Sequence, residues 1–487
     1  AFGSVDNLKN IVKPMFINEH DTSIIFFDLS DGNSRTGGSA LSQVLQTNDS
    51  ECPKVSNVDK FKSFFEVTQN FISQEKILSY HDKSDGGLMT TLLESSFAGH
   101  VGIDIYYNQD ILDINKFMFN EELGVVMQIS NKFLAEVQTV YESINVSNYV
   151  IAKINTSYDV NIYADKNLVY NNSLENLHKT WHRTSYEIQR IRDNSDTAEI
   201  EYDSIGKIEK KGLYIDKKFS DPDINKIFSI SKTKPKVAIL REQGINGHYE
   251  MANAFSVNGF EAVDVTMNSL IAKENNLEDY QGAVFCGGFS YGDVLGAGKG
   301  WANKILHNEL LLDSFSNYFN NLDKFVLGIC NGCQALSNLQ VIIPGSHHWP
   351  SFLQNNSERF ESRIVMVSIE KSNSIFLSGM NDSKLPIVIS HGEGRAYLTE
   401  KDYMNLKDNN KVCMSYIEDS EEFSEIYPYN PNGSYMGVAG VSSSSGNVTL
   451  MMPHPERLMD IKQFPTNNNE KISPWSKFFY NARMHLK

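Results

Sequence analysis

Apolar and polar residues alternate along the first third of the chain in blocks that predict both strands and helices. Apolar runs of strand length and segments with apolar residues at helical spacing follow one another. The strand-like runs are 23–29 and 125–129, and the helix-like segments are 40–45, 61–72 and 86–98. Because strand-like and helix-like segments both occur throughout this region, we expect one α+β domain over residues 1–185.

The pattern changes twice further along the chain. Residues 186–234 are charged and short of apolar periodicity, which predicts a linker or an extended wrapping segment. From Lys236 onward strands and helices alternate. The expected strands are 237–240, 262–265, 282–286 and 325–329, and the expected helices are 247–257 and 301–319. This alternation predicts a doubly wound α/β domain over 235–487, with its functional site at the carboxyl ends of the strands.

Composition narrows the classes of function. The formal net charge of −16 argues against nucleic acid as a partner, because phosphate binding needs clustered Lys and Arg. No stretch approaches the roughly 20 apolar residues of a membrane span, so no membrane partner is expected. Five cysteines in 487 residues make no disulfide framework and predict a reducing, cytoplasmic location. The chain begins with Ala1 rather than Met, so we expect a processed piece or an excised fragment.

Cys330 lies in the most informative segment of the chain. The sequence Gly328-Ile329-Cys330-Asn331-Gly332 follows an apolar, strand-like run and precedes a helix-like one. A strand, a tight turn with small residues and a helix form the nucleophile elbow of hydrolases, here with cysteine in place of serine. The helix N-terminus favours a thiolate and offers N–H groups to an oxyanion. We therefore predict that Cys330 is a nucleophile.

A second segment supplies the groups that such a nucleophile needs. An apolar run at 448–452 leads into Pro453-His454-Pro455-Glu456. In extended chain, residues i and i+2 point to the same side, so we expect His454 to be the base and Glu456 to orient it. The oxyanion hole is expected from the N–H of Asn331 and from the turn at Gly287 and Gly288, where glycine permits close approach.

Other interpretations of these residues remain open at this level. Cys330 could be a buried structural thiol, and His454 a hydrogen-bonded core histidine. Cys330 and Cys333 also form a Cys-x-x-Cys pair at a helix start, which is typical of thiol–disulfide exchange. The domain could also be an inactive docking scaffold or a different cysteine hydrolase. Turnover of glutamine, compared with that of peptides or esters, separates these possibilities.

The motifs together resemble a known family. Segments 287–293, 328–334 and 453–457 are similar to those of class I glutamine amidotransferases, whose domain is flavodoxin-like. With segments 240–244, 356–361 and 390–395, the chain more narrowly resembles the large, single-polypeptide phosphoribosylformylglycinamidine synthases. The resemblance implies that Cys330, His454 and Glu456 hydrolyse glutamine to glutamate and ammonia through a thioester. It also makes Asn356, Ser357, Arg359 and Phe360 candidates for shaping the glutamine pocket.

The front of the chain resembles another part of the same family. Segments 80–87, 97–100 and 119–124 look like the C-terminal-type domain of its second aminoimidazole-ribonucleotide-synthase-like unit. This resemblance implies that Asp82 is a magnesium ligand and Ser84 a nucleotide contact. The alternative is an ordinary helix cap, with Ser84 or Asp85 starting a helix at Gly87. Gly37-Gly38-Ser39 ahead of a helix could hold an anion or form a tight turn.

The reaction that the resemblance implies belongs to purine biosynthesis. Ammonia from glutamine passes internally to a synthetase site, where ATP with Mg²⁺ activates formylglycinamide ribonucleotide and ammonia converts it to the amidine. The members of this family are far longer, and their amino-terminal synthetase domains have no counterpart in this chain. We therefore expect this chain alone to retain only the glutaminase chemistry, and the full-length protein to be a monomer.

Overall fold

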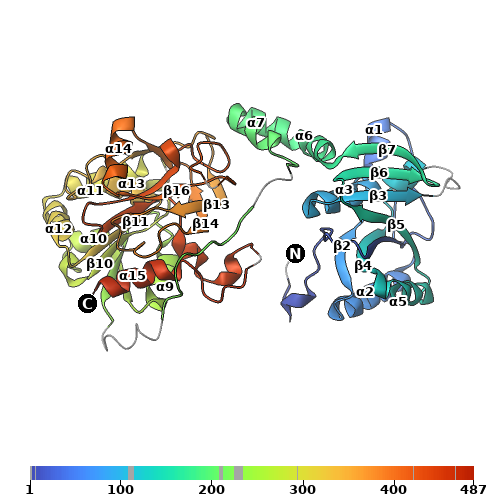
Figure 1. Cartoon of the computed structure of the whole chain (residues 1–487), viewed down its shortest axis with the longest axis horizontal. Helices are drawn as coiled ribbons and strands as arrows, with labels where there is room; N and C mark the ends of the chain where they lie inside the picture. Colours follow the sequence, from blue (N-terminus) through green and yellow to red (C-terminus); the bar gives the residue numbers. More distant parts are fainter. Residues whose placement is uncertain are drawn as a thin grey trace. The chain divides into compact units, whose positions relative to one another are not determined.

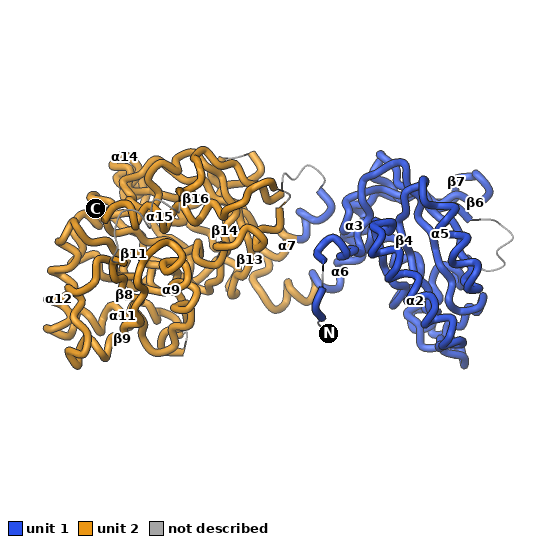
Figure 2. Tube along the Cα trace, turned by 90° about the horizontal axis from the view of Figure 1, so that it is seen from below, with its two compact units in different colours: residues 1–186, 202–208 blue, residues 187–201, 209–487 orange. Residues whose placement is uncertain are grey.

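The computed structural model describes residues 3–5, 7–107, 114–207, 212–223, 234–292, 294–420, 422–466 and 468–486. It divides into two compact units, drawn in different colours in Figure 2. Unit 1 comprises residues 1–186 and 202–208, and unit 2 comprises 187–201 and 209–487. Parts of the predicted linker, 208–211 and 224–233, lie outside the described residues, so the predicted limits at 185 and 235 stay predictions.

Unit 1 is built around a seven-stranded, mostly antiparallel sheet in the order β2-β4-β1-β5-β3-β6-β7 (Figure 1). Its strands are β1 (Thr22–Asp28), β2 (Ile77–Asp82), β3 (Gly102–Tyr107), β4 (Gly124–Ser130), β5 (Ser147–Asn155), β6 (Asp159–Ala164) and β7 (Asn167–Ser173). Its helices are α1 (Ala40–Leu45), α2 (Val58–Ser73), α3 (Gly87–Gly99), α4 (Ile114–Phe119), α5 (Asn131–Ser143) and most of α6 (Leu174–Arg192). The expected α+β domain is therefore present.

The central strand β1 shows why its sequence is apolar throughout. Ile24 and Phe26 pack into the core on the α3 side of the sheet, and Ile25 and Phe27 into the core on the α2 and α5 side. Since successive side chains of a strand point to opposite faces, a strand covered on both faces needs a continuous apolar run. The same continuous apolar run is the reason why the sequence predicts a buried strand over 23–29, and β1 is buried along its whole length.

Unit 2 contains a nine-stranded sheet in the order β14-β13-β16-β17-β18-β11-β10-β8-β9. The strands are β8 (Lys236–Arg241), β9 (Glu261–Thr266), β10 (Gly282–Phe285), β11 (Phe325–Ile329), β13 (Glu361–Ile369), β14 (Lys384–His391), β16 (Val412–Tyr416), β17 (Val438–Ser442) and β18 (Val448–Met451). The half from β18 to β9 is parallel and the other half is antiparallel. A separate two-stranded sheet pairs β12 (Ser351–Leu353) with β15 (Arg395–Tyr397).

Helices cover both faces of the parallel half (Figure 1). They are α9 (His248–Val257), α10 (Met267–Ile271), α11 (Ala297–Leu306), α12 (Glu309–Asn320), α13 (Asn331–Asn338), α14 (Glu400–Asp408) and α15 (Ser476–His485). Phe255 of α9 stacks edge-on against Phe479 of α15, while Phe285 of β10 packs on Trp301 of α11. This is the doubly wound arrangement that the alternation predicts, with an antiparallel extension that it does not.

Two segments differ from the prediction. The helix expected over 301–319 is two helices, because Asn308 caps α12 by accepting a hydrogen bond from the N–H of Leu311. The first part of the predicted linker is helical, with the end of α6 and all of α7 (Ser195–Asp203). Among the described residues, the helices are all too short or too polar to cross a membrane.

Candidate active site

Cys330 stands on a turn between β11 and α13, as the elbow interpretation requires. Its φ of 53° and ψ of −109° are non-helical, and its N–H donates to the carbonyl of Met451 in β18 at 3.0 Å. A Cβ atom on Gly332 would lie 2.0 Å from the carbonyl oxygen of Phe285. Glycine is therefore required at that position, and the turn holds Cys330 in a conformation that costs about 1–3 kcal/mol and that marks functional sites.

His454 and Glu456 form a buried pair at the same site. Their side chains are each 1% exposed, and Nδ1 of His454 lies 2.6 Å from Oε1 of Glu456. The N–H of His454 donates to the carbonyl of Val388 at 2.8 Å, which fixes its backbone against β14. With Nδ1 occupied by Glu456, Nε2 is the ring nitrogen left to exchange a proton with Cys330.

The electrostatics of the pair favour a charged imidazole. Burial lowers the pKa of His454, but the charges of Glu456 and Cys330 outweigh burial and raise that pKa to about 9. A carboxylate in contact with a histidine stabilises the imidazolium form in this way. His454 therefore holds a proton firmly enough to deliver it to a leaving group.

The extended geometry expected for His454 and Glu456 is wrong. Residues Pro455–Leu458 form a 3₁₀ turn, with His454 at its N-cap. The physical reason is Pro455, whose fixed φ suits the first position of a helix and whose missing N–H costs nothing there. The two side chains nevertheless meet, because the turn folds Glu456 back towards the imidazole ring.

Gly287 lies directly beside Cys330 and His454. A Cβ atom at Gly287 would be 2.8 Å from Cε1 of His454 and 3.2 Å from Cβ of Cys330. A Cβ atom at Gly288 would collide with the backbone of Ile245 and Asn246. Gly287 thus brings backbone close to Cys330, where an oxyanion hole would need it, and Gly288 lines the same cavity.

Asn331 supplies the other expected donor. It is the first residue of α13, so its N–H has no acceptor within the helix. Its side chain is held by Ser290, whose hydroxyl donates to Oδ1 at 2.8 Å, and by Gln334, whose Oε1 accepts from Nδ2 at 3.1 Å. The start of α13 is therefore fixed next to the sulfur.

A cavity of about 180 Å³ opens in front of Cys330. Its lining includes Cys330, His454, Asn331 and Gly288, together with Gln334, Arg359, Phe360, His391, Glu393 and Arg457. Of the four residues expected to shape a glutamine pocket, Arg359 and Phe360 line this cavity. Ser357 is buried behind the wall, and Asn356 lines a neighbouring cavity and accepts from Arg395 at 2.8 Å.

The thiol–disulfide interpretation finds no support in the geometry. Cys330 and Cys333 are both free thiols. Cys333 is fully buried, and burial raises its pKa well above the ordinary value, so it is a poor thiolate. Cys333 instead packs in the core behind the first turn of α13.

His391 is a site residue to which the sequence assigned no role. It is 2% exposed, lines the cavity, and its Nε2 lies 3.0 Å from Nδ2 of Asn432. Burial, reinforced by the charge of His454, lowers the pKa of His391 to about 3, so it stays neutral. In the sequence, its place in the segment 390–395 was the only sign of a role in the site. Its hydrogen-bond partner Asn432 lies 41 residues away, so local pattern does not reveal the pair.

In unit 1, Asp82 is the last residue of β2, and Ser84 lies between β2 and α3. The carboxyl group of Asp82 is 74% exposed, and Ser84 is also exposed. The helix-cap alternative is wrong for both Ser84 and Asp85, because Gly86 is the N-cap of α3 and no side chain caps the helix. Among the described residues, no group of three or more His, Cys, Asp or Glu side chains is placed to hold a metal ion.

The anion position suggested by Gly37-Gly38-Ser39 is taken by the protein itself. Ser39 is the N-cap of α1 and accepts from the N–H of Ser42. Oε1 of Glu121 accepts from the N–H of Ala40 at 2.8 Å and from that of Gly86 at 2.9 Å. One carboxylate thus occupies the start of α1 and the turn before α3 together.

Comparison with known proteins agrees with these two units. Residues 234–486 match the CobB/CobQ-like glutamine amidotransferase domain, and residues 27–164 match the AIR synthase related protein, C-terminal domain. PurLQS from Thermotoga maritima is 26% identical over 52% of this chain and 100% of its own, with a TM-score of 0.39. T. maritima PurL complexed with ATP is 12% identical over 34% of this chain and 27% of its own, with a TM-score of 0.28.

The same T. maritima PurL complexed with FGAR is 11% identical over 35% of this chain, with a TM-score of 0.29, and the match spans 30% of that PurL chain. The order of the two matched domains along one chain confirms the resemblance to phosphoribosylformylglycinamidine synthases. Since the amidotransferase match spans more than half of its residues, the chain belongs to the CobB/CobQ-like glutamine amidotransferase domain family.

Proposed function

We propose that unit 2 is a glutaminase in which Cys330, His454 and Glu456 form the catalytic triad. The observation that carries this proposal is that the strained Cys330 elbow and the buried His454 line one cavity, with Glu456 2.6 Å from Nδ1 of His454. A nucleophile, a base and a group that orients the base are the parts that acyl transfer needs. The family of the domain makes the side-chain amide of glutamine the acyl donor.

In the first half of the reaction, Sγ of Cys330 forms a bond to the amide carbon of glutamine. His454 takes the thiol proton at Nε2 and then donates it to the amide nitrogen, so that the C–N bond breaks and ammonia leaves. The negative charge on the oxygen is stabilised by the N–H of Asn331 and by backbone of the Gly287–Gly288 turn. The product on the enzyme is a γ-glutamyl thioester at Cys330.

In the second half, water replaces ammonia. His454 removes a proton from water, the resulting hydroxide attacks the thioester carbon, and the C–S bond breaks to release glutamate. Glu456 stabilises the imidazolium in both halves, as the pKa of about 9 for His454 supports. Arg359 and Phe360 shape the wall of the cavity, with Asn356 and Ser357 behind them.

Unit 1 is proposed to serve the reaction that consumes ammonia. Asp82 fits the role of one magnesium ligand, because Mg²⁺ is held by one or two carboxylates together with substrate phosphates and water. Its carboxylate at the end of β2 is 74% exposed, and Ser84 is exposed two residues further on, so both groups are accessible to a phosphate chain. When bound, ATP with Mg²⁺ would activate the amide oxygen of formylglycinamide ribonucleotide for replacement by ammonia.

The complete reaction proposed is the glutamine- and ATP-dependent conversion of formylglycinamide ribonucleotide to formylglycinamidine ribonucleotide in purine biosynthesis. The chain spans about a third or less of the PurL chains that it matches. We therefore assign the synthetase step to this unit acting with the amino-terminal synthetase domains of the full-length protein, and only the glutaminase step to this chain alone.

The test is turnover of glutamine by the purified chain. We expect glutamate and ammonia in equal amounts, and a loss of at least about 10³-fold in Cys330→Ala. Cys52→Ala is the control, since Cys52 is an exposed cysteine in unit 1. Turnover that survives Cys330→Ala, or an absence of turnover in the folded chain with peptide or ester hydrolysis in its place, would contradict the proposal.

A further inference from the structure

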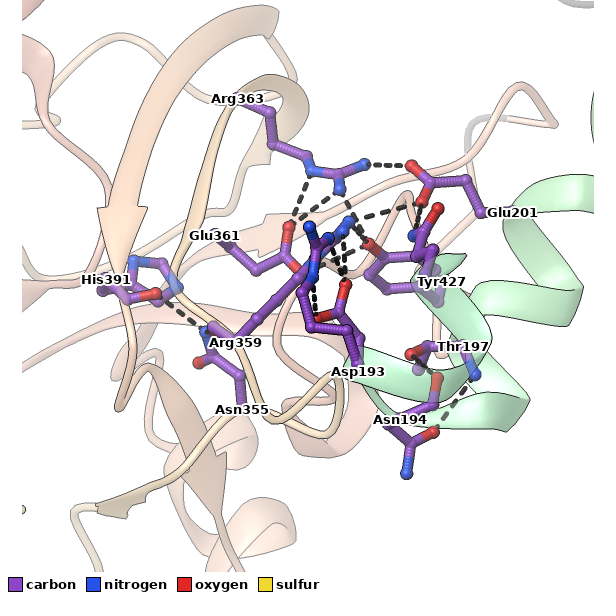
Figure 3. A network of polar contacts seen from close by, with 12 residues as sticks. Asp193, Asn194, Thr197, Glu201, Asn355, Arg359, Glu361, Arg363, His391 and Tyr427 are labelled. Carbon is purple, nitrogen blue, oxygen red and sulfur yellow. Dashed lines mark hydrogen bonds and ion pairs between the residues drawn. The ribbon is translucent and has the colours of Figure 1, made fainter. Parts of the chain in front are cut away.

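Arg359, which lines the cavity, belongs to a dense ion-pair network (Figure 3). Its Nε lies 3.1 Å from Oε1 of Glu361, its Nη1 lies 3.2 Å from Oδ2 of Asp193, and its Nη2 lies 3.3 Å from Oε2 of Glu201. The hydroxyl of Tyr427 also accepts a hydrogen bond from Nη2. The guanidinium charge is thus met by three carboxylates, which leaves little of it for a ligand.

A second arginine closes the network. Arg363 lies 2.8 Å from Glu361 and 3.3 Å from Glu201, and its guanidinium stacks over the ring of Tyr427 at 5.1 Å. Glu361 is 1% exposed and Asp193 is 8% exposed at the side chain, so these charges are largely shielded from water. Ion pairs with this degree of burial are held in place more strictly than surface pairs.

The two outer carboxylates come from the segment that precedes the amidotransferase domain. Asp193 directly follows the last residue of α6 and Glu201 lies in α7, and residues 187–201 group with unit 2. The N–H of Asn194 also donates to the carbonyl of Ser357 at 3.4 Å. Figure 3 shows the helical segment with Asp193 and Glu201 facing Arg359 and Arg363.

An open space lies between part of this segment and the loop at residues 354–360, which joins β12 to β13. A cavity of about 550 Å³ lies between α7 and the loop, lined by Thr197 and Ile200 on one side and by Asn356 and Glu358 on the other. Beside this open space, the charged contacts and the Asn194 hydrogen bond connect the segment to the loop.

The loop transmits its position to the catalytic cavity through Asn355. Nδ2 of Asn355 donates to the carbonyls of Arg359 at 3.0 Å and of His391 at 2.8 Å, while its Oδ1 accepts from the N–H of Gly394 at 2.9 Å. Arg359 and His391 both line the cavity. Because Asn355 bonds to both segments, a displacement of Arg359 would also move the part of the wall around His391.

We propose that Arg359 is a positioning residue for the glutamine pocket, and that Asp193 and Glu201 of the connecting segment set its position. This inference rests on the glutaminase proposed above. It makes the segment 193–201 a part of the pocket's support, so a change in that segment alters the binding of glutamine without touching the sulfur. The part of the protein that exerts this control is the segment 193–201, which belongs to unit 2.

The test compares two reagents for Cys330 in the full chain. A diazoketone analogue of glutamine reports on the pocket, and iodoacetamide reports on the thiol alone. In Asp193→Asn/Glu201→Gln we expect the rate of alkylation by the analogue to fall about tenfold. We expect kcat/KM for glutamine to fall by the same factor, because KM rises. The rate of alkylation by iodoacetamide should be unchanged. Glu199→Gln, which removes an exposed carboxylate from the same helix, should match the unaltered chain.

A double-mutant cycle separates positioning through Arg359 from an independent effect. If the carboxylates act through Arg359, Arg359→Gln combined with Asp193→Asn/Glu201→Gln should be no worse than Arg359→Gln alone. Three results would overturn the inference. The losses caused by Arg359→Gln and by Asp193→Asn/Glu201→Gln could multiply when combined, the loss in Asp193→Asn/Glu201→Gln could be less than twofold, or the loss could be equal with both reagents. Asp193→Asn alone is the milder variant if the double substitution unfolds.

These outcomes differ from failure of the proposed glutaminase. If glutamine does not protect Cys330 from the analogue in the unaltered chain, the glutaminase proposal fails before any variant is compared. If protection is present and the variants behave like the unaltered chain, only the positioning role of Arg359 fails.

Discussion

The contact between His454 and Glu456 gives the sharpest prediction about catalysis. Glu456→Gln keeps the size of the side chain and removes the charge that most strongly raises the pKa of His454. Burial, which lowers that pKa, remains. We therefore expect the imidazole to become a weaker base, and its imidazolium form to lose its main stabilising partner.

The size of the effect follows from the pair. The net rise from an ordinary imidazole pKa of about 6.5 to about 9 corresponds to ~3 kcal/mol at about 1.4 kcal/mol for each pKa unit. Burial opposes Glu456 in this net value and Cys330 adds to it, so the figure sets the scale of the effect. Lost entirely from the transition state, this is about 10²-fold in rate. A glutamine amide that donates to Nδ1 also places the remaining ring proton on Nε2, the wrong tautomer for a base, which extends the expected loss of kcat to between about 10² and 10⁴.

The assay is steady-state release of ammonia from glutamine, with the fold checked by circular dichroism. Glu309→Gln is the matched control, because Glu309 is an exposed carboxylate of unit 2 on α12. We expect it to keep the activity of the unaltered chain. A Glu456→Gln chain that is folded and retains more than a tenth of kcat would refute the argument that this charge supports the base.

Two further predictions concern the same site. Gly287→Ala places a methyl group 2.8 Å from Cε1 of His454, so we expect a folded chain whose kcat for glutamine falls about 10²-fold, and activity within threefold would contradict the close approach. Burial and the charge of His454 lower the pKa of His391 to about 3, whereas an unfolded imidazole titrates near 6.5. The unfolded state therefore binds this proton first as the pH falls, and the free energy of unfolding should drop by up to about 1.4 kcal/mol per pH unit between about 6.5 and 3. Urea titrations followed by tryptophan fluorescence should show a smaller drop in His391→Gln, and parallel curves for the two chains would show that His391 is not the group responsible.

Local sequence patterns predicted the elements that position the nucleophile. The apolar run before Cys330 and the glycines on either side of it specify a strand, a tight turn and a helix, because a side chain at Gly332 would collide with Phe285. The pair His454 and Glu456 was predicted for the wrong reason. Their spacing suits a strand, but Pro455 imposes a turn whose effect on the two side chains is the same.

The network around Arg359 could not be read from local pattern. Asp193 and Glu201 lie about 160 residues before Arg359, in a charged stretch that predicts a linker or an extended wrapping segment. Their pairing with Arg359 and Arg363 is a tertiary contact that local pattern does not specify. His391 was missed for the same reason, since its neutral state results from burial and from the charge of His454 rather than from its neighbours in sequence.

The most direct test of the central claim is the site at which a diazoketone analogue of glutamine alkylates the chain, located by mass spectrometry of its peptides. We predict one adduct, on Cys330, that glutamine prevents and that Cys330→Ala abolishes. An adduct on another residue, an adduct on Cys330 that glutamine does not reduce, or no adduct in the folded chain would contradict a glutaminase site at Cys330.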